Sequence, residues 1–239
     1  MSKKIYLDYQ ATTPVDPKIL KKMLPFFSEN FANPHSNNHQ DGRLANEVIE
    51  EARENVANLI NAQPSEIIFT SGATESNNLA LKSIAKNYFE NKCQIISCKT
   101  EHKCVLESCH YLEKQKNKVH YLDVNEDGLI DLNTLEVIIK DKPSLISIMH
   151  ANNEIGVLQP LKKIGELCKK YNAIFHSDIA QSIGTTAVDV KSLNLHAASI
   201  SGHKIYGPKG IGALYLSKSI KNILKPLIDG GGQEMGIRS

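Results

Sequence analysis

The sequence predicts an α/β protein built on a mainly parallel, seven-stranded sheet with helices on both faces. Two observations support this fold class. Short apolar runs alternate along the chain with longer amphipathic stretches, a pattern typical of strands buried in a parallel sheet and of the helices that cover it. The 239 residues are 41% hydrophobic and 23% charged, which is the composition of a folded globular chain and excludes disorder as the main state.

The first part of the chain differs from the rest. Residues 1–40 are predicted to form an N-terminal arm, with an extended course and a short helix, that lies outside the sheet. The arm contains a polar segment at 33–39 and four prolines, Pro14, Pro17, Pro25 and Pro34. Residues 41–239 are expected to form one large domain, which ends within a loop.

The large domain is predicted to open with an amphipathic helix at 41–62. Apolar residues recur there three or four positions apart, at Leu44, Val48, Ala52 and Val56. Seven apolar runs then predict strands at 66–70, 94–98, 118–122, 145–149, 173–177, 197–201 and 212–216. Helices are expected between most of them, at 76–90, 104–116, 132–140 and 161–171. The glycine-rich segment 229–239 is predicted to be a loop.

Charge and hydropathy limit the classes of partner. The chain carries 28 Lys and Arg against 26 Asp and Glu, a formal net charge of +2, which gives no reason to expect nucleic acid or an acidic membrane surface. No apolar run approaches the length of a membrane helix, and the N-terminus lacks the apolar core of a secretory signal. With five cysteines and no such signal, we expect reduced thiols in the cytoplasm.

Polar residues follow strand after strand of the predicted sheet. In an open α/β sheet, ligands bind beyond the carboxyl ends of the strands, so these residues predict a site. The small-residue turn at 71–74 opens a helix, and its N–H groups and hydroxyls suit a phosphate. The same turn also fits an ordinary helix cap made by Ser71 or Thr74. The other strand ends contribute His102, Asn153, Asp178, Gln181 and Lys204.

A lysine, a carboxylate and a phosphate-binding turn together indicate pyridoxal 5'-phosphate. Lys204 can form a Schiff base with the aldehyde, Asp178 can keep the pyridine nitrogen protonated, and the 71–74 turn can hold the phosphate. Nucleotide binding is disfavoured, because the sequence contains neither a P-loop nor a G-x-G-x-x-G after the first strand. The cysteines between 93 and 109 lack paired metal-ligand spacing, so we expect buried, inert thiols and no metal site.

A colinear set of segments resembles the NifS and IscS class of cysteine desulfurases, which belong to the fold type I pyridoxal-phosphate enzymes and the class V aminotransferase family. The segments are YLDYQATTPVDP at 6–17, FTSGATESNNLA at 69–80, TEHKCVL at 100–106, SIMHANNEIGVLQP at 147–160, HSDIAQSIG at 176–184, SGHKIYGPKGIGALY at 201–215 and GGGQEMGIRS at 230–239. The resemblance therefore covers the whole chain.

The resemblance implies a role for individual residues. Lys204 would be the Schiff-base lysine, and Asp178 would partner the pyridinium nitrogen. His102 would stack on the cofactor ring and move protons, and Gln181 would bond the phenolic oxygen. Asn153 would lie near the cofactor and substrate. The phosphate would be surrounded by Ala73, Thr74, Ser201, Gly202 and His203.

The reaction implied by the resemblance converts L-cysteine to L-alanine and leaves a persulfide for iron–sulfur clusters and thiolated RNA. In this family the attacking cysteine lies in a Ser/Gly-rich loop of a region beyond the GGGQE segment, with a small C-terminal domain. None of the five cysteines here follows residue 169, so the isolated chain is expected to be impaired in sulfur transfer. The family also implies a homodimer and an iron–sulfur scaffold or sulfur-acceptor partner.

Two alternatives remain open at the level of the sequence. The chain could be a non-catalytic remnant, or half of a split gene, that binds pyridoxal phosphate or a partner only. It could also act as a selenocysteine lyase or another carbon–sulfur lyase of the same fold.

Overall fold

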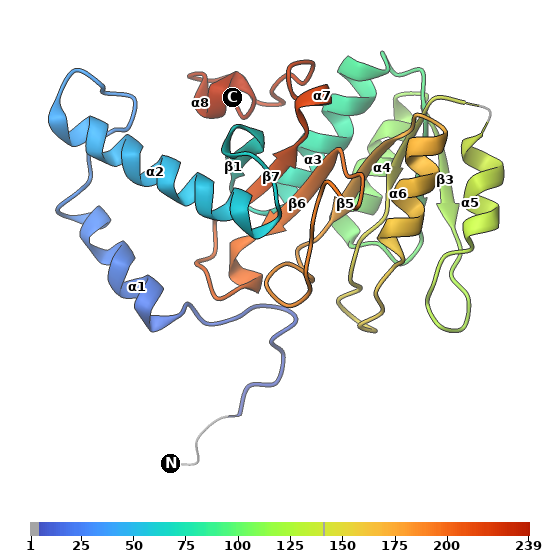
Figure 1. Ribbon diagram of the computed structural model, residues 1–239, viewed down its shortest axis with the longest axis horizontal. Helices are drawn as coiled ribbons and strands as arrows, with labels where there is room; N and C mark the ends of the chain where they lie inside the picture. Colours follow the sequence, from blue (N-terminus) through green and yellow to red (C-terminus); the bar gives the residue numbers. More distant parts are fainter. Residues whose placement is uncertain (1–4, 141) are drawn as a thin grey trace.

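A single seven-stranded sheet organises the computed structural model, which describes residues 5–140 and 142–239. Its strand order is β1-β7-β6-β5-β4-β2-β3 (Figure 1). Strands β2 to β6 pair in parallel, whereas β7 runs antiparallel to both β6 and β1. The strands are β1 (Ile67–Thr70), β2 (Gln94–Cys98), β3 (Lys118–Leu122), β4 (Ser144–Ser147), β5 (Ile174–Asp178), β6 (Ala197–Ser201) and β7 (Gly212–Leu216). The predicted mainly parallel sheet is confirmed.

Helices cover both faces of the sheet, as predicted. Apolar residues of α3, α4 and α7 form one core with one face, and residues of α2, α5 and α6 form a second core with the other. The main helices are α2 (Gln40–Leu59), α3 (Ala73–Ser83), α4 (Lys103–Lys114), α5 (Leu132–Ile139), α6 (Leu161–Lys170) and α7 (Lys218–Lys221). The helix expected at 76–90 begins three residues earlier, at Ala73, and passes into a π-helical turn, η3 (Ile84–Tyr88).

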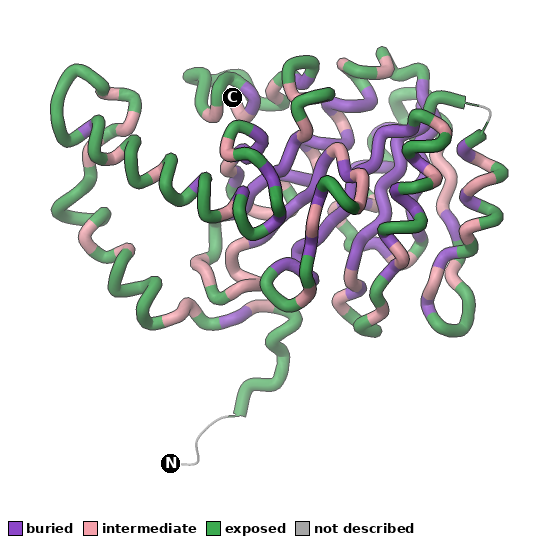
Figure 2. Tube along the Cα trace, viewed as in Figure 1, coloured by how far each residue is buried: buried purple, intermediate pink, exposed green. Residues whose placement is uncertain are grey.

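The central strands are buried because helices cover both faces of the sheet. Strands β2, β4, β5, β6 and β7 consist entirely of buried residues, and Figure 2 shows this buried band through the middle of the molecule. Phe175 at the centre of β5 is fully buried. Edge strand β3 is only partly buried, which is consistent with its position at the end of the sheet.

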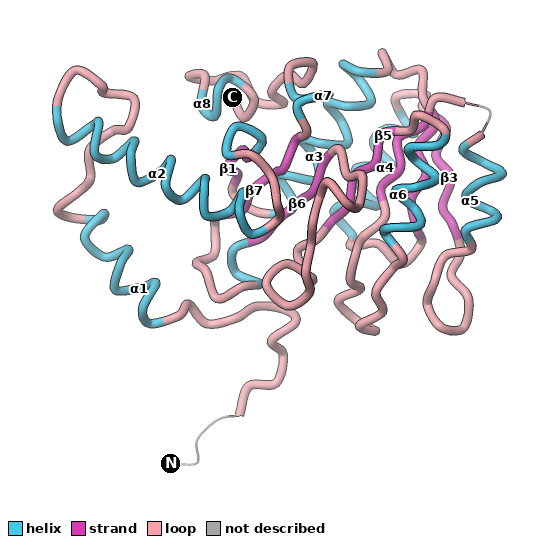
Figure 3. Tube along the Cα trace, viewed as in Figure 1, coloured by secondary structure: helices cyan, strands magenta, loops and turns pink. Residues whose placement is uncertain are grey.

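The N-terminal arm and the first half of α2 project from this body (Figure 1). The arm contains α1 (Pro17–Met23) and the 3₁₀ turn η1 (Leu24–Phe27), neither of which has a buried residue. The amphipathic helix predicted at 41–62 is confirmed as α2, in which Leu44 is 48% and Val48 is 41% exposed. Only Gly42, Arg53 and Ala57 of α2 are buried, because its N-terminal half extends beyond the sheet. Figure 3 shows α1 and the N-terminal half of α2 outside the layered part.

The C-terminal segment is more structured than the predicted loop. It contains one helical turn, α8 (Gln233–Gly236), and Glu234 pairs with the buried Arg53 of α2 at 2.6 Å. Arg238 binds the carboxylate of Glu75 in α3 at 2.8 Å. A sequence pattern dominated by glycine did not reveal these two ion pairs. Two further short elements are the 3₁₀ helices η2 (Pro64–Glu66) and η4 (Gly202–Lys204). Within the described ranges, no helix has the length and apolar character needed to cross a membrane.

Candidate active site

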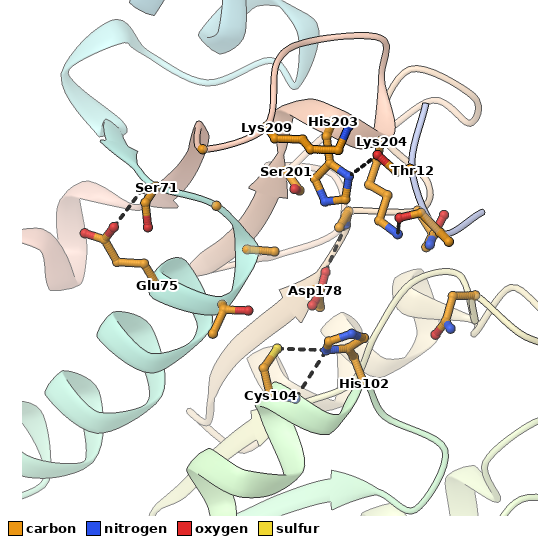
Figure 4. Close-up of a pocket in the computed structure, with 18 of the residues that line it drawn as sticks. Thr12, Ser71, Glu75, His102, Cys104, Asp178, Ser201, His203, Lys204 and Lys209 are labelled. Atoms are coloured by element: carbon orange, nitrogen blue, oxygen red, sulfur yellow. Dashed lines mark hydrogen bonds between the residues drawn. The ribbon is translucent and has the colours of Figure 1, made fainter. Parts of the chain in front are cut away.

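A cavity of about 550 Å³ lies beyond the carboxyl ends of β2, β5 and β6, where helices α3 and α4 begin. We call it the strand-end cavity. Figure 4 shows its side chains arriving from several elements of the sheet and from the arm. All the predicted site residues except Gly202 line it: Ala73, Thr74, His102, Asn153, Asp178, Gln181, Ser201, His203 and Lys204. Gly202 begins η4, and its backbone N–H donates to the Ile211 carbonyl at 3.0 Å.

Lys204 ends η4 and extends its amine toward the arm. Its Nζ donates to the carbonyl oxygens of Gln10 and Ala11, at 2.5 and 3.0 Å. Burial lowers the pKa of Lys204, against the opposing effect of the Asp178 carboxylate. The neutral amine is the form that attacks a carbonyl carbon, so the environment favours the nucleophilic state.

Asp178 ends β5 as a buried carboxylate. Its Oδ1 accepts the N–H of Ala180 at 3.0 Å, and its Oδ2 accepts Nδ2 of Asn77 at 2.7 Å. Burial raises the pKa of Asp178, whereas these two hydrogen bonds and the nearby amine of Lys204 act to lower it. A carboxylate held this way can stabilise a cation inside the cavity.

The 71–74 turn is shaped by glycine. Gly72 has φ of +152° and ψ of −180°, a conformation that is essentially restricted to glycine. A Cβ on the neighbouring Gly212 would lie 2.6 Å from Gly72 Cα, so two glycines allow β7 to pack directly beside the turn. The ordinary capping alternative is wrong: among the described residues, no side chain caps α3, whose N-cap is Gly72. The first-turn N–H groups of α3 are therefore free to bind an anion.

Glu75 supports the same turn from outside. Its Oε2 accepts the N–H of Ser71 at 2.7 Å, while Arg238 binds its carboxylate. Burial raises the pKa of Glu75, but the hydrogen bonds from Arg238 and Ser71 outweigh burial and hold the pKa below its ordinary value. The ionised carboxylate thus joins the C-terminal segment to the turn.

His102 is the N-cap of α4, and Cys104 lies beside it. Nδ1 of His102 accepts the backbone N–H of Cys104 at 3.2 Å and lies 3.0 Å from its Sγ (Figure 4). Cys104 lines the strand-end cavity and is half-buried, so it differs from the other four cysteines, which are buried as expected. Within the described part of the chain, no group of three or more His, Cys, Asp or Glu could hold a metal ion.

The remaining predicted residues form the mouth of the cavity with the arm. Gln181 donates to the Gln10 carbonyl at 2.9 Å, and Nδ1 of His203 lies 3.0 Å from Thr12 Oγ1. Asn153 donates to the Glu154 carboxylate at 2.5 Å.

Sequence reasoning missed several contributors to the site: Asn77, Cys104, Glu75, Ala11 and Thr12. These residues lie within the segments 6–17, 69–80 and 100–106, which resemble the family. The resemblance did not assign a role to any of them.

The comparisons with known proteins agree on the family. The aminotransferase class-V family model matches residues 5–238. Cysteine desulfurase IscS of Rickettsia africae (strain ESF-5) is 57% identical over 235 residues, which is 98% of this chain. A structure described as a NifS-like protein superposes with a TM-score of 0.94 at 42% identity, covering 99% of this chain and 65% of that one. SspA in complex with cysteine gives a TM-score of 0.92 at 46% identity, covering 97% and 67%.

The chain spans 57% of the length of the IscS relatives that it matches. The aligned part nevertheless contains the complete sheet and the strand-end cavity. Class V aminotransferases and cysteine desulfurases depend on pyridoxal 5'-phosphate, and the cavity offers an amine, a buried carboxylate and an uncapped helix N-terminus that fit its aldehyde, pyridine nitrogen and phosphate. The chain belongs to the aminotransferase class-V family, with the fold of the NifS-like pyridoxal-phosphate enzymes.

Proposed function

We propose that this chain is the cofactor-binding part of a cysteine desulfurase, which removes sulfur from L-cysteine and leaves L-alanine. The observation that carries the proposal is the convergence of Lys204, Asp178 and the uncapped turn at 71–74 on one cavity. In this proposal residues 41–239 form the cofactor domain, and the arm, residues 1–40, completes its rim through Ala11 and Thr12.

Each part of the cavity would hold a different part of the cofactor. Lys204 Nζ would bond to the carbonyl carbon, and Asp178 would pair with the protonated pyridine nitrogen. The phosphate would lie at the start of α3, near Ala73, Thr74, Ser201, Gly202 and His203. Gln181 and Asn153 would bond groups at the cavity mouth. When bound, pyridoxal phosphate supplies an electron sink that stabilises negative charge at the amino acid Cα.

Proton transfer would use two groups of the chain. The amine of Lys204, with its pKa lowered by burial, can accept a proton from the substrate Cα once it is free. His102 lies on the opposite element, at the start of α4, and would stack on the ring and handle the second proton.

The sulfur must pass to a thiol, so that L-cysteine and a thiol become L-alanine and a persulfide. Burial raises the pKa of Cys104, which keeps the thiol in the cavity protonated. The other four thiols are buried. We therefore propose that the 239-residue chain alone transfers sulfur slowly and depends on an acceptor thiol from outside these cysteines.

The partners of the chain are proposals of the same kind. Apolar residues exposed on α1, η1 and α2, among them Phe27 at 75% and Leu44 at 48%, support association into a homodimer. A sulfur acceptor or an iron–sulfur scaffold would receive the persulfide. The five free cysteines support a reducing compartment, and we propose the cytoplasm.

Cofactor binding is tested by adding pyridoxal 5'-phosphate to the purified chain and recording the visible absorption band of the lysine-bound form. We expect the band in the parent chain and in Lys162→Ala, an exposed lysine on α6, and its loss in Lys204→Ala. Failure of the parent chain to bind the cofactor would contradict the proposed site.

Sulfur transfer is tested separately with L-cysteine and dithiothreitol, by measuring alanine and sulfide. We expect alanine formation to require Lys204 and to be slow. A persulfide found by mass spectrometry on any of the five cysteines after reaction with L-cysteine would contradict the proposed dependence on an outside acceptor. A competition between L-cysteine and L-selenocysteine identifies the preferred substrate.

A further inference from the structure

Two side chains, those of Asn77 and Cys104, join Asp178 to His102 through an uninterrupted series of three hydrogen bonds. Asn77, on α3 and fully buried, uses Nδ2 to reach Asp178 Oδ2 at 2.7 Å and Cys104 Sγ at 3.2 Å. Cys104 Sγ lies 3.0 Å from Nδ1 of His102. The proposed function places Asp178 and His102 at the cofactor ring. The series connects them through Asn77 and Cys104, which have no role at Lys204 or at the phosphate.

The chemistry of the donors gives the series a direction. A carboxylate only accepts hydrogen bonds, so the Asn77 amide must turn its NH₂ group toward Asp178, and its second N–H points to Cys104. The backbone N–H of Cys104 only donates, and it points to His102 Nδ1 at 3.2 Å. That nitrogen therefore carries a lone pair, and the Cys104 thiol can join it only by donating its S–H.

The ring proton of neutral His102 must consequently be on Nε2. His102 lines the strand-end cavity, and its Nδ1 is engaged by hydrogen bonds at the start of α4. Nε2 is therefore the ring nitrogen that remains for the cavity. The resting imidazole presents an N–H to the cavity and not a lone pair. This assignment follows from the partners of Nδ1, since the position of a hydrogen is inferred from its network.

Asn77 shows that the arrangement has a cost. Its Oδ1 is buried and has no hydrogen-bond partner among the described residues, although buried polar atoms normally have one. An apolar side chain of the same shape would avoid that unsatisfied oxygen. The amide offsets this cost through the two hydrogen bonds that it donates, to Asp178 and to Cys104.

We propose that Asn77 and Cys104 are positioning residues that hold His102 in its Nε2–H tautomer and connect its ring to the carboxylate of Asp178. Cys104 thus serves the site as a hydrogen-bond donor and not as a sulfur carrier. The functional importance of this tautomer rests on the proposed function, but the tautomer itself is a property of the unliganded chain and is measured without cofactor.

The experiment is ¹⁵N NMR of the unliganded chain labelled at histidine, with His102→Gln used to assign the His102 signals among the nine histidines. We expect the parent chain at neutral pH to show Nε2 as the protonated nitrogen. Cys104→Ala removes the S–H donor and should raise the ratio of the Nδ1–H to the Nε2–H form about fivefold, as expected for one lost hydrogen bond. Cys104→Ser keeps an O–H donor and should restore most of the parent ratio.

Asn77→Leu tests the other end of the series. It removes both N–H donors at nearly constant shape, so the Cys104 thiol should lose its fixed orientation and the His102 ratio should move in the same direction as in Cys104→Ala. Circular dichroism confirms that each variant is folded.

The proposal is overturned if His102 of the parent chain carries its proton on Nδ1, or if folded Cys104→Ala has the parent ratio. Failure of cofactor binding with the expected tautomers would instead contradict the proposed function alone.

Discussion

The strand-end cavity and a groove beside the arm are built in opposite ways. The strand-end cavity, about 550 Å³, is lined by polar side chains at the ends of buried strands. The arm groove, about 410 Å³, lies between η1 and α2. Its apolar members are Phe26, Phe31, Leu44 and Val48, and its acidic members are Glu29, Asp41, Glu47 and Glu51.

The difference lies in what holds the side chains in place. Asp178 is fixed by two hydrogen bonds and is almost fully buried, and its neighbours are tied to β-strands. Phe31 in the arm groove is 76% exposed. It follows η1, which has no buried residue. Fixed polar groups recognise a small ligand of defined chemistry. Exposed apolar groups with a charged rim are typical of a surface that another polypeptide covers.

The largest expected effect compares one phenylalanine from each region. Phe175→Ala in β5 should lower the free energy of unfolding by about 3–5 kcal/mol, because it opens a cavity in a closely packed core. Phe31→Ala should change it by less than about 0.5 kcal/mol in the monomer. Urea unfolding of both variants at low protein concentration measures the difference. Equal losses would show that the arm is as tightly packed as the sheet.

Asp178→Asn should weaken pyridoxal 5'-phosphate binding by about 100-fold, because a buried partner of a cationic ring nitrogen is lost. Asp123→Asn is the matched control, since Asp123 follows β3 but is exposed and pairs with Lys99 at 2.6 Å. It should change the affinity less than about twofold. A fluorescence titration with the cofactor measures both constants. Equal affinities for Asp178→Asn and the parent chain would remove Asp178 from the site.

Asp178→Asn also has an expected effect on the unliganded fold. Burial raises the pKa of the Asp178 carboxyl, so the folded state binds its proton more tightly than the unfolded state does. Ionisation of the carboxyl therefore lowers the stability of the folded state as the pH rises from the ordinary pKa to the folded-state pKa. The unliganded variant should therefore be at least as stable as the parent chain at pH 7, and this difference should vanish in acid. A less stable variant at pH 7 would show that the hydrogen bonds outweigh burial.

The sequence was a good guide where one physical rule decided the outcome. The bounds of β2, β3, β6 and β7 were predicted to the residue, because short, mostly apolar runs between helical stretches are typical of strands in a covered sheet. The strand-end rule alone also predicts that Lys204 and Asp178 lie at one site, and both line the strand-end cavity.

Long-range contacts limited the rest of the prediction. Leu44 and Val48 follow a helical period, but the period does not reveal whether another element lies against them. Asn77 is separated from Asp178 by 101 positions, and Glu75 from Arg238 by 163, so local patterns could not pair them. The roles of Gln181 and Asn153 came only from the family resemblance.

Glu75→Gln tests the support of the phosphate turn and should cost about 1 kcal/mol at pH 7, a value reduced by solvent screening because Arg238 is partly exposed. Because the folded-state pKa of Glu75 is lowered, its contribution is present above the ordinary pKa of about 4.5 and is lost as the pH falls through the folded value. The parent chain and the variant should converge in acid. A stability difference between the two proteins that persists at pH 2 would show that Glu75 acts through packing and not through its charge.

The smallest expected effect concerns the arm groove, where the change should appear in association and not in folding. In the proposed homodimer, Leu44→Ser should remove roughly 30 Å² of apolar area from the contact between copies and weaken association about threefold, or roughly 0.7 kcal/mol. Val137→Ser on α5, an apolar residue that is 63% exposed far from the groove, is the control and should leave association unchanged. Sedimentation equilibrium measures both. If Val137→Ser weakens association as much as Leu44→Ser does, the groove is not the surface through which two copies meet.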